Sequence, residues 1–92
     1  MANPNRRKLA KRILIQLIEA DVEMGFGLVD EAKAFRASGQ PEFSCRALQD
    51  AENILVDIDL RLRRLGDSES VPFRPLVSEL RNEITAAERE PS

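Results

Sequence analysis

The chain has 92 residues, of which 33% are charged and 42% are hydrophobic, and its formal net charge is −2. This length allows one domain at most, and the composition is too apolar for a disordered chain. With one cysteine and no histidine, the chain lacks an internal disulfide, the usual transition-metal ligand sets and histidine acid/base catalysis.

The first periodic segment predicts a helix over residues 5–38. Its main apolar row recurs at three- and four-residue spacing, which is typical of the buried face of a helix. The residues of this main row are Leu9, Ile13, Leu17, Ala20, Met24, Leu28, Ala32 and Phe35. A neighbouring row contains Leu14, Ile18, Gly25 and Val29. Because the two rows fill a wide arc, we expect this helix to contact two other helices.

A second helix is predicted over residues 41–65, after a turn that contains Gly39. Pro41 suits the first helical turn, and Gly66 suits the position just past the end. The apolar spacing alternates between three and four residues, which is typical of a helix-bundle seam. The residues of this seam are Leu48, Ala51, Leu55, Ile58, Leu62 and Leu65.

A third helix is predicted over residues 73–89. Its first turn should be irregular, because Pro72 and Pro75 cannot both lie deep inside a helix. Its apolar row is Phe73, Leu76, Leu80, Ile84 and Ala87. No segment shows the two-residue alternation of a strand, and short connections favour antiparallel neighbours. The sequence therefore predicts one all-α domain over residues 1–92, an up-down-up three-helix bundle with an overhanging first helix, which dimerisation could complete.

Large and small residues alternate around the first predicted turn. They are Leu28, Ala32, Phe35, Gly39, Ser44, Leu48 and Ala51, and in this spacing they resemble a tetratricopeptide repeat hairpin. The pattern departs from that family at Glu31, Pro41 and Val56, and it covers about a quarter of the chain. In length and helix count the chain also resembles the three-helix microtubule-interacting and trafficking module. Both families bind peptides or partner helices, so the resemblance implies a binding scaffold without catalytic residues.

Two features inside the first helix need a packing explanation. Asp21 falls within the apolar arc, where an unpaired carboxylate is costly. Antiparallel pairing of the first two helices brings Arg61 within one helical turn of the level of Asp21. This predicts an Asp21–Arg61 ion pair that fixes the register of the two helices. The alternatives are that Asp21 faces a gap in the bundle or a partner-binding surface. Gly25 and Gly27 each cost about 1 kcal/mol relative to alanine. They indicate either close approach of the third helix, with residues 85–87 at this level, or a kink, hinge or break.

Some apolar residues are not obviously covered by three helices. Val22 and Phe26 lie on the flank of the first helix, whereas Val56 and Leu60 point away from the seam of the second. Apolar rows of this kind are typical of surfaces that bind an amphipathic helix. We expect these four residues to line a groove for a helix of a protein partner or of a second copy, so a homo-oligomer is expected.

Basic residues gather at the end of the bundle where the first helix starts and the second ends. The candidate anion-binding residues are Arg6, Arg7, Lys8, Lys11, Arg12, Arg61 and Arg64. Residues 15–60, in contrast, hold ten acids and three bases. This end could bind an acidic protein segment, anionic lipid or nucleic acid, or it could be a solvated helix end that contacts the acidic region of a second copy. Nucleic acid is less favoured, because no aromatic residues interleave the bases for stacking.

The sequence therefore favours a non-enzymatic protein–protein interaction module, with anion binding as the alternative. No metal set, phosphate loop or nucleophile–base pair can be assembled, so no cofactor is expected. The lone Cys45 is expected to be a small packing residue. Without an apolar run of membrane-spanning length, we expect a cytoplasmic protein. We also expect a bacterial origin.

Overall fold

The computed structural model describes residues 4–90, with side chains from Lys8 onward. Three long helices, α1 (Pro4–Ala37), α2 (Pro41–Leu65) and α4 (Arg74–Arg89), account for most of this range. Between the last two lie the one-turn helix α3 (Asp67–Ser70) and a 3₁₀ turn over Val71–Phe73. Residues 4–90 contain no strand, so the prediction of an all-α three-helix bundle is confirmed.

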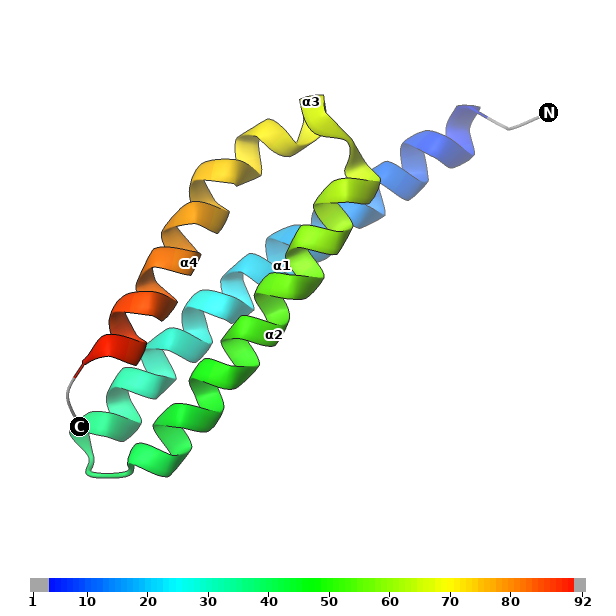
Figure 1. Cartoon of the computed structure of the whole chain (residues 1–92). Coiled ribbons are helices and arrows are strands. Elements are labelled where there is room, and N and C mark those ends of the chain that lie inside the picture. The colour runs from blue at the N-terminus through cyan, green and yellow to red at the C-terminus, as the bar shows by residue number, and fades with distance from the viewer. Residues whose placement is uncertain (1–3, 91–92) are drawn as a thin grey trace.

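The helices form a rod with principal extents of 57 × 18 × 14 Å. Figure 1 shows α2 running antiparallel beside α1, and α4 returning in the direction of α1 to pack against both. The first turns of α1 project past α3 at one end of the rod (Figure 1), so the predicted overhang of the first helix is present. The α1–α2 turn lies at the opposite end.

The turn between α1 and α2 is closed by backbone hydrogen bonds around Gly39. The N–H of Gln40 donates to the carbonyl of Phe35 at 2.8 Å, and the N–H of Gly39 donates to that of Arg36 at 3.1 Å. This pairing is the Schellman motif, which satisfies the last carbonyl groups of a helix. Gly39 has φ +74°, a left-handed conformation that costs a side chain about 1–2 kcal/mol. The motif explains why a three-residue connection is enough.

Substitution of Gly39 by alanine is therefore expected to lower the free energy of unfolding by about 1 kcal/mol, because the added Cβ opposes the positive φ. Chemical denaturation followed by circular dichroism would measure this loss. Gly39→Asn is the matched control, since asparagine tolerates the left-handed region better than alanine does. Equal stability of the alanine variant and the natural protein would contradict the expectation.

The connection from α2 to α4 is longer but also closed by local hydrogen bonds. Gly66 has φ +99° and ψ 162°, a conformation that is essentially restricted to glycine. The buried Ser70 hydroxyl donates to the carbonyl of Leu62 at 3.0 Å and also reaches that of Gly66. The predicted irregular start of the third helix is confirmed by the 3₁₀ turn that contains Pro72, with Pro75 in the first turn of α4.

The core contains apolar residues from all three long helices and from the 3₁₀ turn. They are Ile18, Val22, Val29, Ala32, Ala47, Leu48, Ala51, Ile58, Leu65, Phe73, Val77, Leu80, Ile84 and Ala87. The predicted inner faces of α2 and α4 are largely confirmed. Leu76 is the exception, because it is 41% exposed and its neighbour Val77 is buried in its place.

The predicted inner face of α1 is confirmed for one of its two rows. The neighbouring row is inside, and its members Ile18 and Val29 are almost fully buried. The prediction for the main row is wrong over most of its length, because Leu9, Ile13, Leu17 and Met24 are 56%, 48%, 43% and 56% exposed. Val22, predicted to lie uncovered on the flank, is also part of the core. Apolar residues occur around much of α1, so periodicity alone did not identify the buried side.

Gly25 explains why the second row faces the core. A Cβ placed on Gly25 would lie 2.7 Å from Cδ2 of the buried Leu80, so the missing side chain lets α4 approach α1 closely. No atom lies within 4 Å of the corresponding Cβ position on Gly27. The close-approach prediction is thus confirmed for Gly25, whereas its predicted level at residues 85–87 is wrong. The helix is continuous through both glycines.

The predicted Asp21–Arg61 pair is present. Nη1 of Arg61 donates to Oδ2 of Asp21, and their side chains are 33% and 16% exposed. This pair fixes the register of α2 against α1 at a point where both groups are largely withdrawn from water. In the last turn of α1, Nη1 of Arg36 donates to the carbonyl of Ala87 at 2.7 Å, which fixes the end of α4.

Candidate functional site

The four residues predicted to line one apolar groove do not do so. Val22 is 7% exposed, and Phe26 is half-buried against the core, so both belong to the interior packing of the bundle. Val56 and Leu60 are 58% and 53% exposed on α2. The structure therefore divides the predicted groove into two core residues and two surface residues.

The exposed apolar residues of α1 form a continuous surface instead. We define the α1 row as Leu9, Ile13, Leu17 and Met24, all of which are exposed. At 100° per residue, the α1 row lies on the order of 150° around the helix from the buried residues Ile18, Val22, Gly25 and Val29. From Leu9 to Met24 it extends about 24 Å along the helix axis. A large apolar side chain thus recurs on the outer side of α1, and the small Ala20 is also exposed there.

Other exposed apolar residues are more scattered. Leu76 and Val71 lie on different elements near the α4 start, and the ring of Phe43 packs against Phe35 with centroids 5.4 Å apart. Single exposed apolar side chains are normal on a protein surface. The α1 row differs because its members share one helix side at regular spacing.

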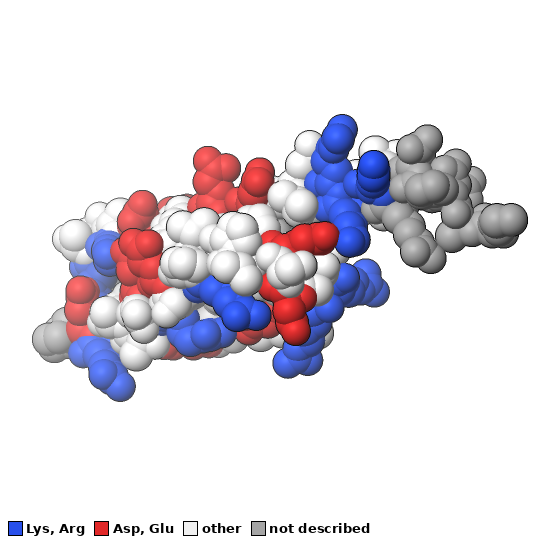
Figure 2. Space-filling model, turned by 90° about the horizontal axis from the view of Figure 1, so that it is seen from above, with Lys and Arg blue, Asp and Glu red and all other residues white. Residues whose placement is uncertain are grey.

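Charge is sharply segregated along α1. Residues 1–14 contain five bases and no acid, whereas residues 15–32 contain five acids and no base. Figure 2 shows Lys and Arg side chains gathered where α1 leaves the body of the bundle. Lys11 forms an ion pair with Glu69 of α3 at 2.9 Å, while Arg12, Glu19 and Glu23 are exposed. The α1 row therefore passes from a basic to an acidic setting.

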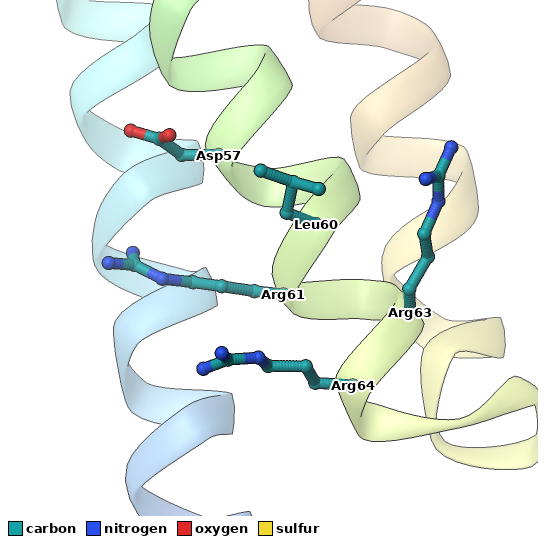
Figure 3. Close-up of a pocket in the computed structure, with 5 residues that line it drawn as sticks. All are labelled: Asp57, Leu60, Arg61, Arg63 and Arg64. Atoms are coloured by element: carbon teal, nitrogen blue, oxygen red, sulfur yellow. The ribbon is translucent and has the colours of Figure 1, made fainter.

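Arginines at the end of α2 line a shallow depression with Asp57 and Leu60. Figure 3 shows Arg61 and Arg64 extending to the same side, toward the α1 ribbon, while Arg63 extends the other way. Arg61 is already paired with Asp21, and Asp57 contributes a negative charge to the same depression. These arginines therefore do not converge on one point where an anion could bind.

The predicted basic end is further divided by acids. Asp67 lies 4.0 Å from Arg74, and Glu69 shares a depression with Lys8, Lys11 and Arg12. The side chains of the candidates Arg6 and Arg7 lie outside the described residues. The structure thus divides the described anion-binding candidates between this depression, with Lys8, Lys11 and Arg12, and the one at the end of α2, with Arg61 and Arg64.

Glu52 of α2 and Glu88 of α4 form a pair of carboxyl groups. A hydrogen bond to Glu52 raises the pKa of Glu88 above its usual value, with smaller contributions from burial and from the negative charge of Glu52. The pair lines a depression that also contains Cys45. Cys45 is exposed, so its predicted packing role is wrong; the neighbouring Ser44 is buried instead.

The Glu52–Glu88 pair is expected to make the bundle slightly more stable in acid. A pKa that is raised in the folded state gives stability that is present below the unfolded pKa and is lost as the pH rises through the folded pKa. Glu88→Gln should therefore increase stability at pH 7 by a few tenths of a kcal/mol, because solvent screens this exposed pair, and should flatten the pH dependence. Thermal unfolding between about pH 4 and pH 7 would test this; an unchanged slope would contradict it.

The described residues show no metal-ion site and no membrane span. Residues 4–90 contain no group of three or more acidic or cysteine side chains arranged to hold a metal ion. None of the described helices combines the length and apolar character needed to cross a membrane. Neither a family model, nor a curated protein, nor a solved structure matches this chain. The resemblance to tetratricopeptide and microtubule-interacting and trafficking hairpins therefore stays a prediction.

The α1 row was assigned to the core from the sequence, so its exposure was missed. One signal favours the correct side, because Gly25 lies in the other row and glycine within a helix is typical of close backbone approach.

Proposed function

We propose that this chain is a non-enzymatic protein–protein interaction module that binds an amphipathic helix along the α1 row. The observation that carries the proposal is the exposure of Leu9, Ile13, Leu17 and Met24 on one side of a continuous helix. Helix recognition commonly uses apolar anchors separated by three, four or seven residues. The α1 row offers this spacing in a protein whose core is already formed by other residues.

The charges beside the α1 row specify the kind of helix that fits. Bases precede Ile15 and acids follow it, so a complementary helix carries acids at one end of its apolar stripe and bases at the other. The resemblance to helical binding scaffolds supports the same class of function.

Anion binding by the basic residues is the competing proposal, supported by the depression that Lys8, Lys11 and Arg12 line together. The dependence of binding on salt concentration distinguishes helix binding from anion binding. Contacts with a polyanion weaken steeply with salt, whereas burial of the α1 row persists. Retention of short DNA or RNA at about 50 mM salt, lost at several hundred mM, would favour the anion proposal.

Affinity capture from the native cell with three baits tests helix binding. Leu17→Glu places a charge in the centre of the α1 row, while Leu76→Glu is the matched control, because these leucines are 43% and 41% exposed. Partners should be captured by the natural protein and by Leu76→Glu, and lost with Leu17→Glu. Recovery of the same partners by all three baits would show that the α1 row is not the binding surface.

A further inference from the structure

We infer that the helix bound along the α1 row is α1 of a second copy, packed antiparallel about a two-fold axis near Leu17. This inference rests on the proposed function and names its partner. A two-fold interface is self-complementary, so the same surface must supply both halves of each contact. The α1 row meets this condition in both shape and charge.

The charge segregation of α1 requires the antiparallel orientation. In a parallel pair, the five bases of residues 1–14 would lie beside the same bases of the second copy, and the acids of residues 15–32 beside acids. Like charges at an interface are costly. Antiparallel packing about Leu17 instead brings the basic turns of each copy beside the acidic turns of the other.

The charged residues also lie on the correct flank. At 100° per residue, Arg12, Glu19 and Glu23 project within about 40° of one another, and all three are exposed. In an antiparallel helix pair, each flank faces the same flank of the other helix. Residues equally distant from the axis come level. Arg12 and Glu23 lie five and six residues from Leu17, so Arg12 of each copy comes within about one residue, or about 1.5 Å, of the level of Glu23 of the other. The two-fold axis forms this pair twice.

The overhang makes the apolar contact accessible. The first turns of α1 project past α3 (Figure 1), and Leu9 and Ile13 are exposed. These two side chains can therefore lie along the outer side of the second copy's α1, near its Met24. The α1 row faces away from the core residues of α1, so the two bundles stay on opposite outer sides. Because four large side chains per copy make a small interface, the dimer should form at micromolar concentration rather than be permanent.

Sedimentation equilibrium over a concentration series tests self-association. As the protein concentration increases, the mass should rise from 10.4 kDa toward twice that value, also in several hundred mM salt. The control variant Leu76→Glu should behave in the same way. Leu17→Glu should remain a monomer. Leu9→Glu should also remain a monomer, and it should stay folded because Leu9 is exposed and is not part of the core. A natural protein that stays monomeric at every concentration overturns the dimer. If partner capture still depends on Leu17, the proposed function survives; if it does not, both fail.

Charge reversal tests the orientation. Arg12→Glu and Glu23→Lys should each weaken the dimer on the order of tenfold, because each turns two attractive contacts into repulsive ones. The double variant should recover to within a few-fold of the natural protein, since its antiparallel contacts are again between opposite charges. Single variants that dimerise as well as the natural protein would indicate parallel packing, because charge reversal there replaces one like-charge contact by another, and would overturn the inferred arrangement.

Discussion

Leu80→Ala is expected to lower the free energy of unfolding by about 3 kcal/mol, since large-to-small changes in a core cost about 2–5 kcal/mol. Leu80 is fully buried, and its side chain lies against the backbone of Gly25 where α1 and α4 meet. A loss of this size is a large part of the total stability of a small domain. Denaturant unfolding at low protein concentration would measure it without a contribution from association.

The Gly25 position sharpens this test. Gly25→Ala puts a Cβ 2.7 Å from Leu80, so overpacking of about 1–3 kcal/mol outweighs the gain in helix propensity. Gly27→Ala is the control, since its Cβ meets open space. This substitution should stabilise α1 by about 1 kcal/mol. In the Leu80→Ala background, the cavity accepts the new methyl group, so Gly25→Ala should become neutral or stabilising. Equal effects of Gly25→Ala in both backgrounds would contradict the close contact.

Loss of Arg61 is expected to destabilise the protein more than loss of Asp21. Arg61→Ala leaves a carboxylate that is 16% exposed without its partner, whereas Asp21→Ala leaves a guanidinium that is 33% exposed. An unpaired buried charge is strongly destabilising, and residual exposure reduces the cost. We expect losses of about 2 kcal/mol for Arg61→Ala and about 1 kcal/mol for Asp21→Ala.

The double variant Asp21→Leu/Arg61→Met separates pairing from net stabilisation. Apolar residues of similar size often replace a buried ion pair without loss, so this variant should be about as stable as the natural protein. Denaturant midpoints of the three variants supply the comparison. An Asp21→Ala variant that is more stable than the natural protein would show that the pair does not hold the register.

Much of the bundle was predictable because α2 and α4 have one clearly apolar side each. In α2 the seam from Leu48 to Leu65 faces charged residues across the helix, and the Gly39 turn limits the connection to a tight hairpin. In α1 two apolar rows compete, and local periodicity does not rank them. The decision is tertiary, because only the approach of Leu80 makes the side with Gly25 the inner one.

The candidate surface was less predictable for the same reason. Once the longer row is assigned to the core, Val22 and Phe26 are left over and are assigned to the surface. The Asp21–Arg61 pair was predictable, since antiparallel register and the cost of an unpaired carboxylate both require it. The division of the basic end was not, because the acids Asp67 and Glu69 belong to a connection whose short helix α3 brings them beside Arg74 and Lys11.

The overhang of α1 has a consequence for the cost of binding. All side chains from Lys8 to Ile13 are exposed, and an isolated helix of so few residues is marginal in water because its nucleation is unfavourable. These turns continue a helix that the bundle already holds, so they propagate without a nucleation step. A second helix therefore meets a preorganised surface, and the association loses less conformational entropy than it would with an arm that folds on contact.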